Sequence, residues 1–257
     1  MFKNISPNFG MGRILKKEML ENLRDYPRDF TDIFLGNFSD GVIAGSELIV
    51  GKDKITVKKG IVKFNGRIYM MTDEYSMPYY PTNREAIIKI KFTDQEIEQD
   101  YKFNKSSIHI EIEVEAGENE IELGRFKLKD GAFLRSTYTD FYDFTTEFNT
   151  INIINCQYAG IGKTTLNPLI LEYFSRILLK FKSENYYDIS LGMLFLNQNH
   201  MERDVIIHYI SNRLGVDYKE YTNKEIYKFL TMIAKEVESG MKRKAEVRQV
   251  RQRTIVD

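Results

Sequence analysis

The chain has 257 residues, of which 42% are hydrophobic and 29% are charged, and 37 basic residues balance 37 acidic ones. This length suffices for one large domain or two small ones. A neutral chain generates no overall field, so we expect neither a membrane nor a specific nucleic acid as its partner. The single cysteine, Cys156, excludes an intramolecular disulfide and a cysteine-rich zinc site, and we expect it to be buried.

The sequence carries no targeting signal that we recognise. The N-terminal stretch lacks the apolar core of a secretory signal, and no later stretch approaches the roughly 18 apolar residues of a membrane span. We therefore expect the chain to start in the cytosol.

Residues 1–40 are predicted to form an N-terminal helical arm. In residues 14–26, ILKKEMLENLRDY, apolar side chains fall on one side of a helix and charged ones on the other. Pro27 is expected to interrupt this helix. A short amphipathic helix gains most of its stability by burying its apolar face, so the arm must pack on something, and another subunit is one candidate.

Residues 41–132 are predicted to form an antiparallel β-domain. Residues 54–71 contain three short strands, with Asn65-Gly66 as a tight hairpin turn. Residues 108–114 alternate isoleucine or valine with polar residues, so one face of that strand is expected to be solvated. The apolar phase changes between Leu123 and Phe126, which indicates a bulge near Gly124.

Residues 133–257 are predicted to form a helical domain with a basic C-terminal tail. Four stretches read as helices, each bounded by turn or cap residues: 136–148, 168–181, 202–215 and 223–240. The end, MKRKAEVRQVRQRTIVD, is locally basic. Because the whole chain is neutral, a solvated tail is favoured over a nucleic-acid contact.

The stretch CQYAGIGKTTLNP, residues 156–168, resembles the end of a phosphate-binding loop around Lys163 and Thr164. The full pattern requires a glycine at position 157, where this chain has Gln157. Pro168 would fall inside the helix that follows such a loop, at the cost of a hydrogen bond and a steric clash. We instead expect a helix to begin at Pro168, with Asn167 or Thr165 as its cap.

A nucleotide hydrolase also needs an acidic magnesium ligand at the end of a buried parallel strand. The nearest candidate, Asp94, ends a stretch with an antiparallel pattern, and no βαβ alternation is present. Nucleotide binding and hydrolysis at Lys163 is therefore the alternative function and not the preferred one.

Three further groups of residues could indicate a metal, catalytic or ligand-binding site. His200 and His208 lie eight residues apart on a predicted helix, too far to share a metal, and are expected to be surface or capping residues. Glu111, Glu113 and Glu115 could form a carboxylate pair, but a solvated strand face produces the same pattern. The aromatic residues of STYTDFYDF could stack on bases or sugars, although packing in a core or between subunits is favoured. We predict no enzyme, and no catalytic, cofactor-binding or metal-ligating residue.

Two stretches together resemble a known family. DGVIAGSELIV with ITVKKGIVKFNGRIYMM, residues 40–50 and 55–71, is similar to β-modules of phage tail and baseplate proteins that carry an N-G-R hairpin. Residues 134–179 resemble the helical half of baseplate proteins from contractile phage tails and from phage-tail-like bacteriocins of Gram-positive bacteria.

This resemblance implies a structural subunit of a contractile injection system, repeated around the tail axis. Such a subunit would connect other baseplate subunits to a peripheral receptor-binding or tail-fibre protein. It would be assembled in the bacterial cytoplasm and released as part of a virion or tail-like particle. We therefore expect an α+β chain with the three parts 1–40, 41–132 and 133–257, acting through protein-protein contacts without a cofactor.

Overall fold

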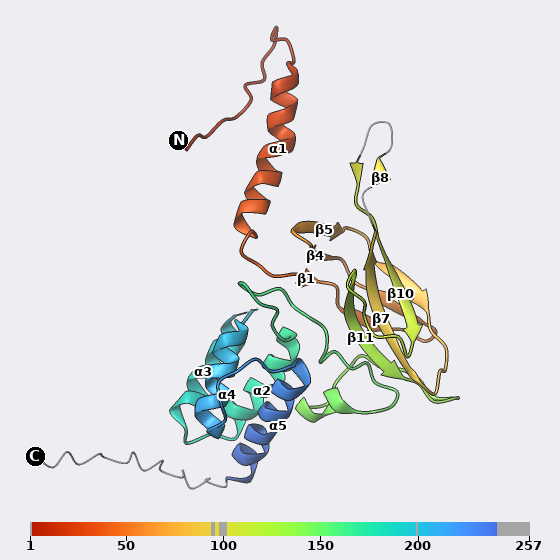
Figure 1. The fold of residues 1–257 in the computed structure, drawn as a ribbon, viewed down its shortest axis with the longest axis vertical. Coiled ribbons are helices and arrows are strands. Elements are labelled where there is room, and N and C mark those ends of the chain that lie inside the picture. Colours follow the sequence, from red (N-terminus) through yellow and green to blue (C-terminus); the bar gives the residue numbers. More distant parts are fainter. Residues whose placement is uncertain (1, 94–95, 98–101, 199, 241–257) are drawn as a thin grey trace, which may run out of the picture.

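The computed structural model of the protein describes residues 2–93, 96–97, 102–198 and 200–240. The chain is an α+β protein with an N-terminal helical arm, antiparallel sheets in the middle and a helical C-terminal part (Figure 1). Asp94 and the basic tail from residue 241 onward lie outside the described residues.

The arm is a single helix, α1 (Lys17–Phe34), which projects away from the rest of the molecule (Figure 1). The prediction that Pro27 interrupts the helix was wrong, because α1 continues for seven residues beyond it. Proline removes one backbone hydrogen bond but does not end a helix when the flanking turns keep their geometry. Here Pro27 is exposed, and the hydroxyl of Thr31 donates to its carbonyl oxygen at 2.8 Å. The helix also begins at Lys17 and not at Ile14.

In the middle of the chain, the described residues form three three-stranded antiparallel sheets and a two-stranded ribbon. The first sheet has the order β1 (Gly41–Gly45), β4 (Gly60–Phe64), β5 (Arg67–Met71), and the second has the order β2 (Leu48–Val50), β3 (Lys54–Val57), β6 (Tyr75–Pro78). The third has the order β10 (Ser106–Ile112), β7 (Glu85–Phe92), β11 (Glu120–Lys127), and the ribbon pairs β8 (Glu96–Ile97) with β9 (Lys102–Phe103).

Several local predictions for this region were confirmed. Asn65 and Gly66 both have positive φ, 47° and 71°, and join β4 to β5 in a hairpin closed by Phe64 and Arg67. The register of β11 against β7 shifts between Glu122 and Gly124. A Cβ at Gly124 would lie 2.9 Å from Leu48, so this position also needs the small residue.

Two details of the β-region differ from the prediction. β3 does not join the β4–β5 hairpin but belongs to another sheet. The alternating stretch 108–114 ends as a strand at Ile112, because Glu113 has a positive φ of 56°. Ile112 and Val114 are about half exposed, so the apolar phase alone did not place them in the core.

The C-terminal part contains α2 (Pro168–Lys180), α3 (Tyr186–Asn197), α4 (Arg203–Leu214) and α5 (Asn223–Ser239). The first of the four predicted helices was wrong: residues 136–148 contain only the short 3-10 helix η1 (Phe141–Thr145). Asp140 caps this turn by accepting from two backbone N–H groups, and buried Phe141 and Phe144 hold it in the core. Helix α3 was not predicted, because its own apolar residues lie on nearly all sides of the helix and so show no helical period.

One continuous hydrophobic core joins the sheets to the helices. The segment between them, residues 149–166, carries buried Ile151, Leu166 and Cys156, as expected for that cysteine. It also forms isolated β-bridges to the sheet region, Arg125 to Asn152 and Val42 to Tyr158. The two regions therefore pack directly on each other.

Candidate functional site

The clearest candidate for an interaction surface is the apolar side of α1. None of the residues of α1 is buried. Its large apolar side chains recur at steps of three and four residues, which places them on one side of the helix. We call this set the α1 stripe: Leu20, Leu23, Tyr26, Phe30, Ile33 and Phe34, all at least 50% exposed.

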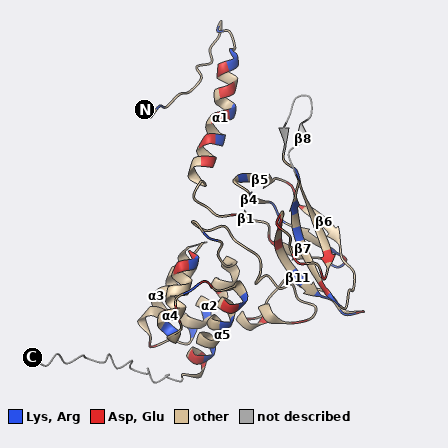
Figure 2. Ribbon diagram, viewed as in Figure 1, with Lys and Arg blue, Asp and Glu red and all other residues tan. Residues whose placement is uncertain are grey.

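The opposite, polar side of α1 is the one that faces the body of the molecule. Arg24, Arg28, Thr31 and Asp32 line a groove against the first sheet. Figure 2 shows basic and acidic residues interleaved along this helix. A surface helix ordinarily turns its apolar side to its own core, and α1 does the reverse. The stripe is therefore available to another chain.

The base of α1 is fixed by a buried lysine of β4. Lys63, 6% exposed, donates from Nζ to the carbonyl oxygens of Leu35 at 2.7 Å, Gly36 at 3.0 Å and Phe38 at 2.7 Å. A cation at a helix C-terminus satisfies carbonyl groups that have no intrahelical partner and interacts favourably with the helix dipole. This contact fixes the position at which α1 leaves the sheet. The side chains of α1 itself stay exposed.

A second apolar surface lies on α3. Its inner side packs closely on α2, where a Cβ on Gly192 would lie 3.2 Å from Leu179. Its charged residue, Asp188, is fully buried and accepts from Ser183, Tyr209 and Arg213. The outer side carries the exposed residues Tyr186, Tyr187, Met193, Leu194 and Leu196. An uncharged, apolar outer side is typical of a protein-protein contact.

The loop that resembles a phosphate-binding loop has a different geometry. Helix α2 begins at Pro168, and the side chain of Asn167 accepts from the N–H of Leu169 at 3.0 Å, which confirms the predicted cap. Lys163, five residues before the helix, bonds to carboxylates of Asp204, at 3.2 Å, and Glu220. These hydrogen bonds raise the pKa of Lys163 above its ordinary value. The lysine thus joins the loop to α4 and to the segment before α5.

Replacing Lys163 with alanine is expected to leave the free energy of unfolding nearly unchanged, because exposed ion pairs contribute little to stability. Urea unfolding of the variant and the wild-type protein measures this change. Calorimetric titration of both with Mg-ATP tests the nucleotide alternative in the same samples. Saturable binding to the wild-type protein that disappears in the variant would favour a nucleotide-binding protein.

The glutamates of the alternating stretch neutralise buried cations of the third sheet. Lys89, 1% exposed, donates to Glu111 at 2.8 Å and Glu120 at 3.0 Å. Burial lowers its pKa, but these hydrogen bonds outweigh burial and the pKa is raised. Glu115 accepts from Arg125 at 2.9 Å, and that bond lowers the pKa of the Glu115 carboxyl. The expected solvated face was confirmed for Glu113 and Glu115, whose side chains are 57% and 72% exposed. Glu111 is 35% exposed and also balances the charge of buried Lys89.

The two histidines do not lie on one helix, contrary to the prediction. His200 precedes α4 and contacts Glu202 at 3.0 Å, whose other oxygen accepts from the N–H of Ile161. His208 lies within α4 and stacks on Tyr218 with 4.2 Å between ring centroids. Among the described residues no three histidine, cysteine or acidic side chains are placed to share a metal ion.

The aromatic stretch before α2 is part of the core, as the packing interpretation predicted. Phe141 and Phe144 are buried, and Phe141 stacks on Tyr227 of α5 with 4.9 Å between ring centroids. The hydroxyl of Tyr138 donates to the carbonyl oxygen of Ile151 at 2.8 Å.

In the part of the chain that the structure describes, no helix is long and apolar enough to cross a membrane.

Fold and surface together define an α+β protein that presents an unpacked amphipathic helix. No protein-family model matches the chain, and no curated protein matches it in sequence. Several solved chains are similar to it, two of them from structures that contain TssK. The crystal structure of TssK matches with a TM-score of 0.40 and 8% identity, over 93% of this chain and 69% of that one.

The second is a chain of the type VI secretion system TssK-TssF-TssG baseplate subcomplex solved by cryo-electron microscopy. It matches with a TM-score of 0.37 and 8% identity, over 91% of this chain and 99% of that one. Similarity at this level carries no argument about the function of the present chain.

Proposed function

We propose that this chain is a structural subunit of the baseplate of a contractile, phage-type tail. It would connect other baseplate subunits to a peripheral receptor-binding or tail-fibre protein, in several copies around the tail axis. The particle, a virion or a tail-like bacteriocin, would assemble in the bacterial cytoplasm before its release. The observation that carries this proposal is the α1 stripe, which points away from its own core.

The stripe supports assembly energetically. Each of its six side chains still exposes half or more of its surface, so burying the remainder gains on the order of 1 kcal/mol per side chain. Association itself costs about 4–15 kcal/mol. The stripe alone is therefore a modest interface, and the outer side of α3 and the exposed Phe2, Ile5 and Phe9 of the N-terminal segment add to the apolar surface. The kind of assembly, a baseplate, is inferred from the resemblance of residues 40–50, 55–71 and 134–179 to phage tail and baseplate proteins.

The proposal is tested by sedimenting lysate from the induced native host and quantifying the chain by mass spectrometry against sheath and tube proteins. We expect recovery in the particle fraction at a fixed, low ratio to the sheath. Recovery in the soluble fraction alone would overturn the proposal.

Weakening the stripe should remove the chain from the particle without unfolding it. We expect the double substitution Leu23→Gln with Phe30→Gln to lower recovery in the particle fraction at least tenfold, because two apolar contacts are lost. The matched control introduces glutamine on the polar side, Glu18→Gln with Asp29→Gln, and should retain wild-type recovery. Equal recovery of both double variants would contradict the role of the stripe. Circular dichroism of the purified variants checks that both retain the native fold.

A further inference from the structure

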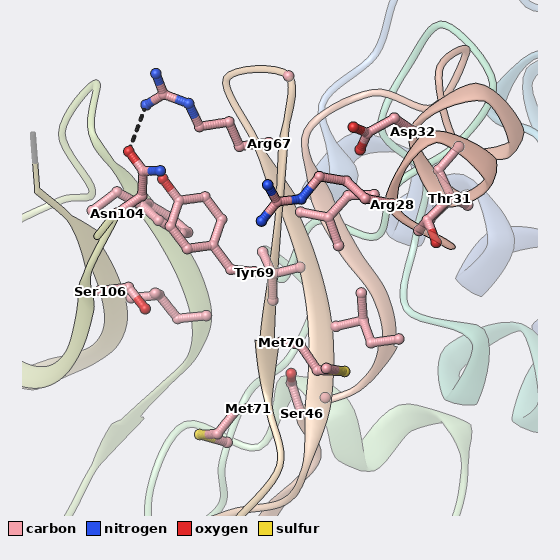
Figure 3. Close-up of a pocket in the computed structure, with 18 of the residues that line it drawn as sticks. Arg28, Thr31, Asp32, Ser46, Arg67, Tyr69, Met70, Met71, Asn104 and Ser106 are labelled. Carbon is pink, nitrogen blue, oxygen red and sulfur yellow. Dashed lines mark hydrogen bonds between the residues drawn. The ribbon is translucent and has the colours of Figure 1, made fainter. Parts of the chain in front are cut away.

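A large groove separates α1 from the β4–β5 hairpin and the start of β10 (Figure 3). Its volume is about 1300 Å³, and it is partly open to solvent. Small-molecule pockets ordinarily enclose about 300–1,000 Å³, so this groove is of a size for a segment of polypeptide.

The floor of the groove includes an open sheet edge. Strand β5 is the last strand of its sheet, and among the described residues no strand pairs with its outer side. Phe64 and Arg67 close a two-residue hairpin, so Arg67, Tyr69 and Met71 bond to β4 while the backbone groups of Ile68 and Met70 point outward. Unpaired N–H and C=O groups of this kind are a template for another strand.

Natural edges are commonly protected by lysine, proline or a bulge within the strand. β5 has none of these: after Arg67 it continues with Ile68, Tyr69, Met70 and Met71, and its register against β4 is regular. Met70 is 70% exposed. The edge is thus chemically suited to an incoming strand.

The charged residues that line the groove indicate which charge an incoming strand should carry. Arg28 extends from α1 toward the hairpin, and Arg67 extends from the hairpin over the groove (Figure 3). Within the described part of the chain Arg28 makes no ion pair, and Arg67 donates to the neutral amide of Asn104 at 3.0 Å. Arg24 also lines the groove, paired with Asp25, and Asp32 is the acidic residue among the lining. Positive charge therefore exceeds negative charge along these walls.

We propose that β5 accepts an extended segment of a different protein, with carboxylates at alternate positions, as an additional antiparallel or parallel strand of the β1-β4-β5 sheet. Side chains of an added strand alternate between two sides, so one set would face Arg28 on α1 and the other set would face the start of β10. This inference goes beyond the baseplate proposal and does not depend on it.

The probe is a labelled peptide of about nine residues that alternates valine with glutamate, compared with its counterpart in which lysine replaces glutamate. Fluorescence anisotropy should show saturable binding of the glutamate peptide to the full chain below roughly 1 mM, and at least tenfold weaker binding of the lysine peptide. The double substitution Arg28→Glu with Arg67→Glu should weaken the glutamate peptide at least tenfold. Lys17→Glu, an exposed charge reversal on the same helix outside the groove lining, is the matched control and should not.

Strand addition has a signature that side-chain contact alone would not give. Amide hydrogen exchange of the wild-type chain should slow at Ile68 and Met70 when the glutamate peptide is added, and stay unchanged at Tyr69, whose N–H already bonds to β4. Met70→Pro should abolish peptide binding and keep the hairpin, because proline on an edge strand removes only an outward donor. Met70→Thr, which keeps the donor, should still bind.

Three results would overturn the proposal. The glutamate peptide could fail to bind, or it could bind without slowing exchange at Ile68 and Met70. The chain alone could also sediment as a dimer that Met70→Pro dissociates, which would make a second copy of the chain the occupant of β5. None of these results would alter recovery of the chain in the particle fraction, so failure here is distinguishable from failure of the baseplate proposal.

Discussion

Replacing Arg125 with methionine is expected to lower the free energy of unfolding by about 3–5 kcal/mol. The guanidinium is 4% exposed and donates to Glu122 at 2.6 Å and 2.8 Å, and to Glu85 and Glu115 at 2.9 Å each. The hydrogen bonds from Arg125 to Glu122, followed by those to Glu115, raise the pKa of the arginine. Methionine fills a similar volume but leaves Glu122, itself 7% exposed, as a buried carboxylate without its cation.

A second substitution removes the Glu122 carboxylate that Arg125→Met leaves buried without its cation. In Arg125→Met with Glu122→Met the buried pair becomes apolar, and we expect at least half of the lost stability to return, because apolar replacements of buried ion pairs are often close to neutral. Arg84→Met, which breaks an exposed pair with Glu113 at 3.4 Å, is the surface control and should cost less than about 1 kcal/mol. Urea unfolding measures all three. A double variant no more stable than Arg125→Met alone would contradict the claim that the cost comes from leaving Glu122 buried without its cation.

The features that the sequence predicted well are those encoded within a few residues. Asn65-Gly66 predicted its hairpin because only residues that tolerate positive φ close such a turn, and Asn167-Pro168 predicted the start of α2 because both are typical of a helix N-terminus. The register change at Gly124 was visible because the apolar phase reverses within one strand.

The features that the sequence did not predict depend on residues far apart in the chain. Lys89 and Glu111 read as ordinary polar positions of two strands, and only the pairing of β7 with β10 and β11 shows that the lysine is buried among glutamates. Helix α3 has no polar side to give it a period. The groove beside β5 requires the placement of α1, which Lys63 determines from another part of the chain.

The candidate interaction surface was partly visible in the sequence. The amphipathic pattern of residues 14–26 predicted a helix that must pack on something, and the structure extends the same stripe to Phe34. Sequence alone could not show that the polar side, and not the apolar side, faces the body. That orientation follows from the anchoring of Leu35, Gly36 and Phe38 by Lys63.

Asp143 organises the loop between the sheets and α2, and its removal is the other change with a large expected effect. Its carboxylate is nearly buried and accepts from both terminal nitrogens of Arg135, at 2.5 Å and 2.6 Å, from the N–H and hydroxyl of Thr139, and from the hydroxyl of Thr146. We expect Asp143→Asn to lower the free energy of unfolding by about 2–4 kcal/mol at neutral pH, because the charge-assisted bonds to Arg135 are lost. Glu147→Gln, an exposed carboxylate paired with Lys127, is the control and should cost no more than about 1 kcal/mol.

The stability that Asp143 contributes should depend on pH in one direction. Hydrogen bonds from Arg135, and then those from Thr146 and Thr139, hold the pKa of Asp143 far below its ordinary value of 3.8. A carboxyl whose pKa is depressed in the folded state stabilises the protein fully above its unfolded pKa and progressively less as the pH falls toward its folded pKa. The difference between wild type and Asp143→Asn in urea unfolding should therefore shrink by about 1 kcal/mol between about pH 5 and pH 3. If the difference in free energy of unfolding between the two proteins stays constant over this range, Asp143 stabilises the fold through the geometry of its hydrogen bonds and not through its charge.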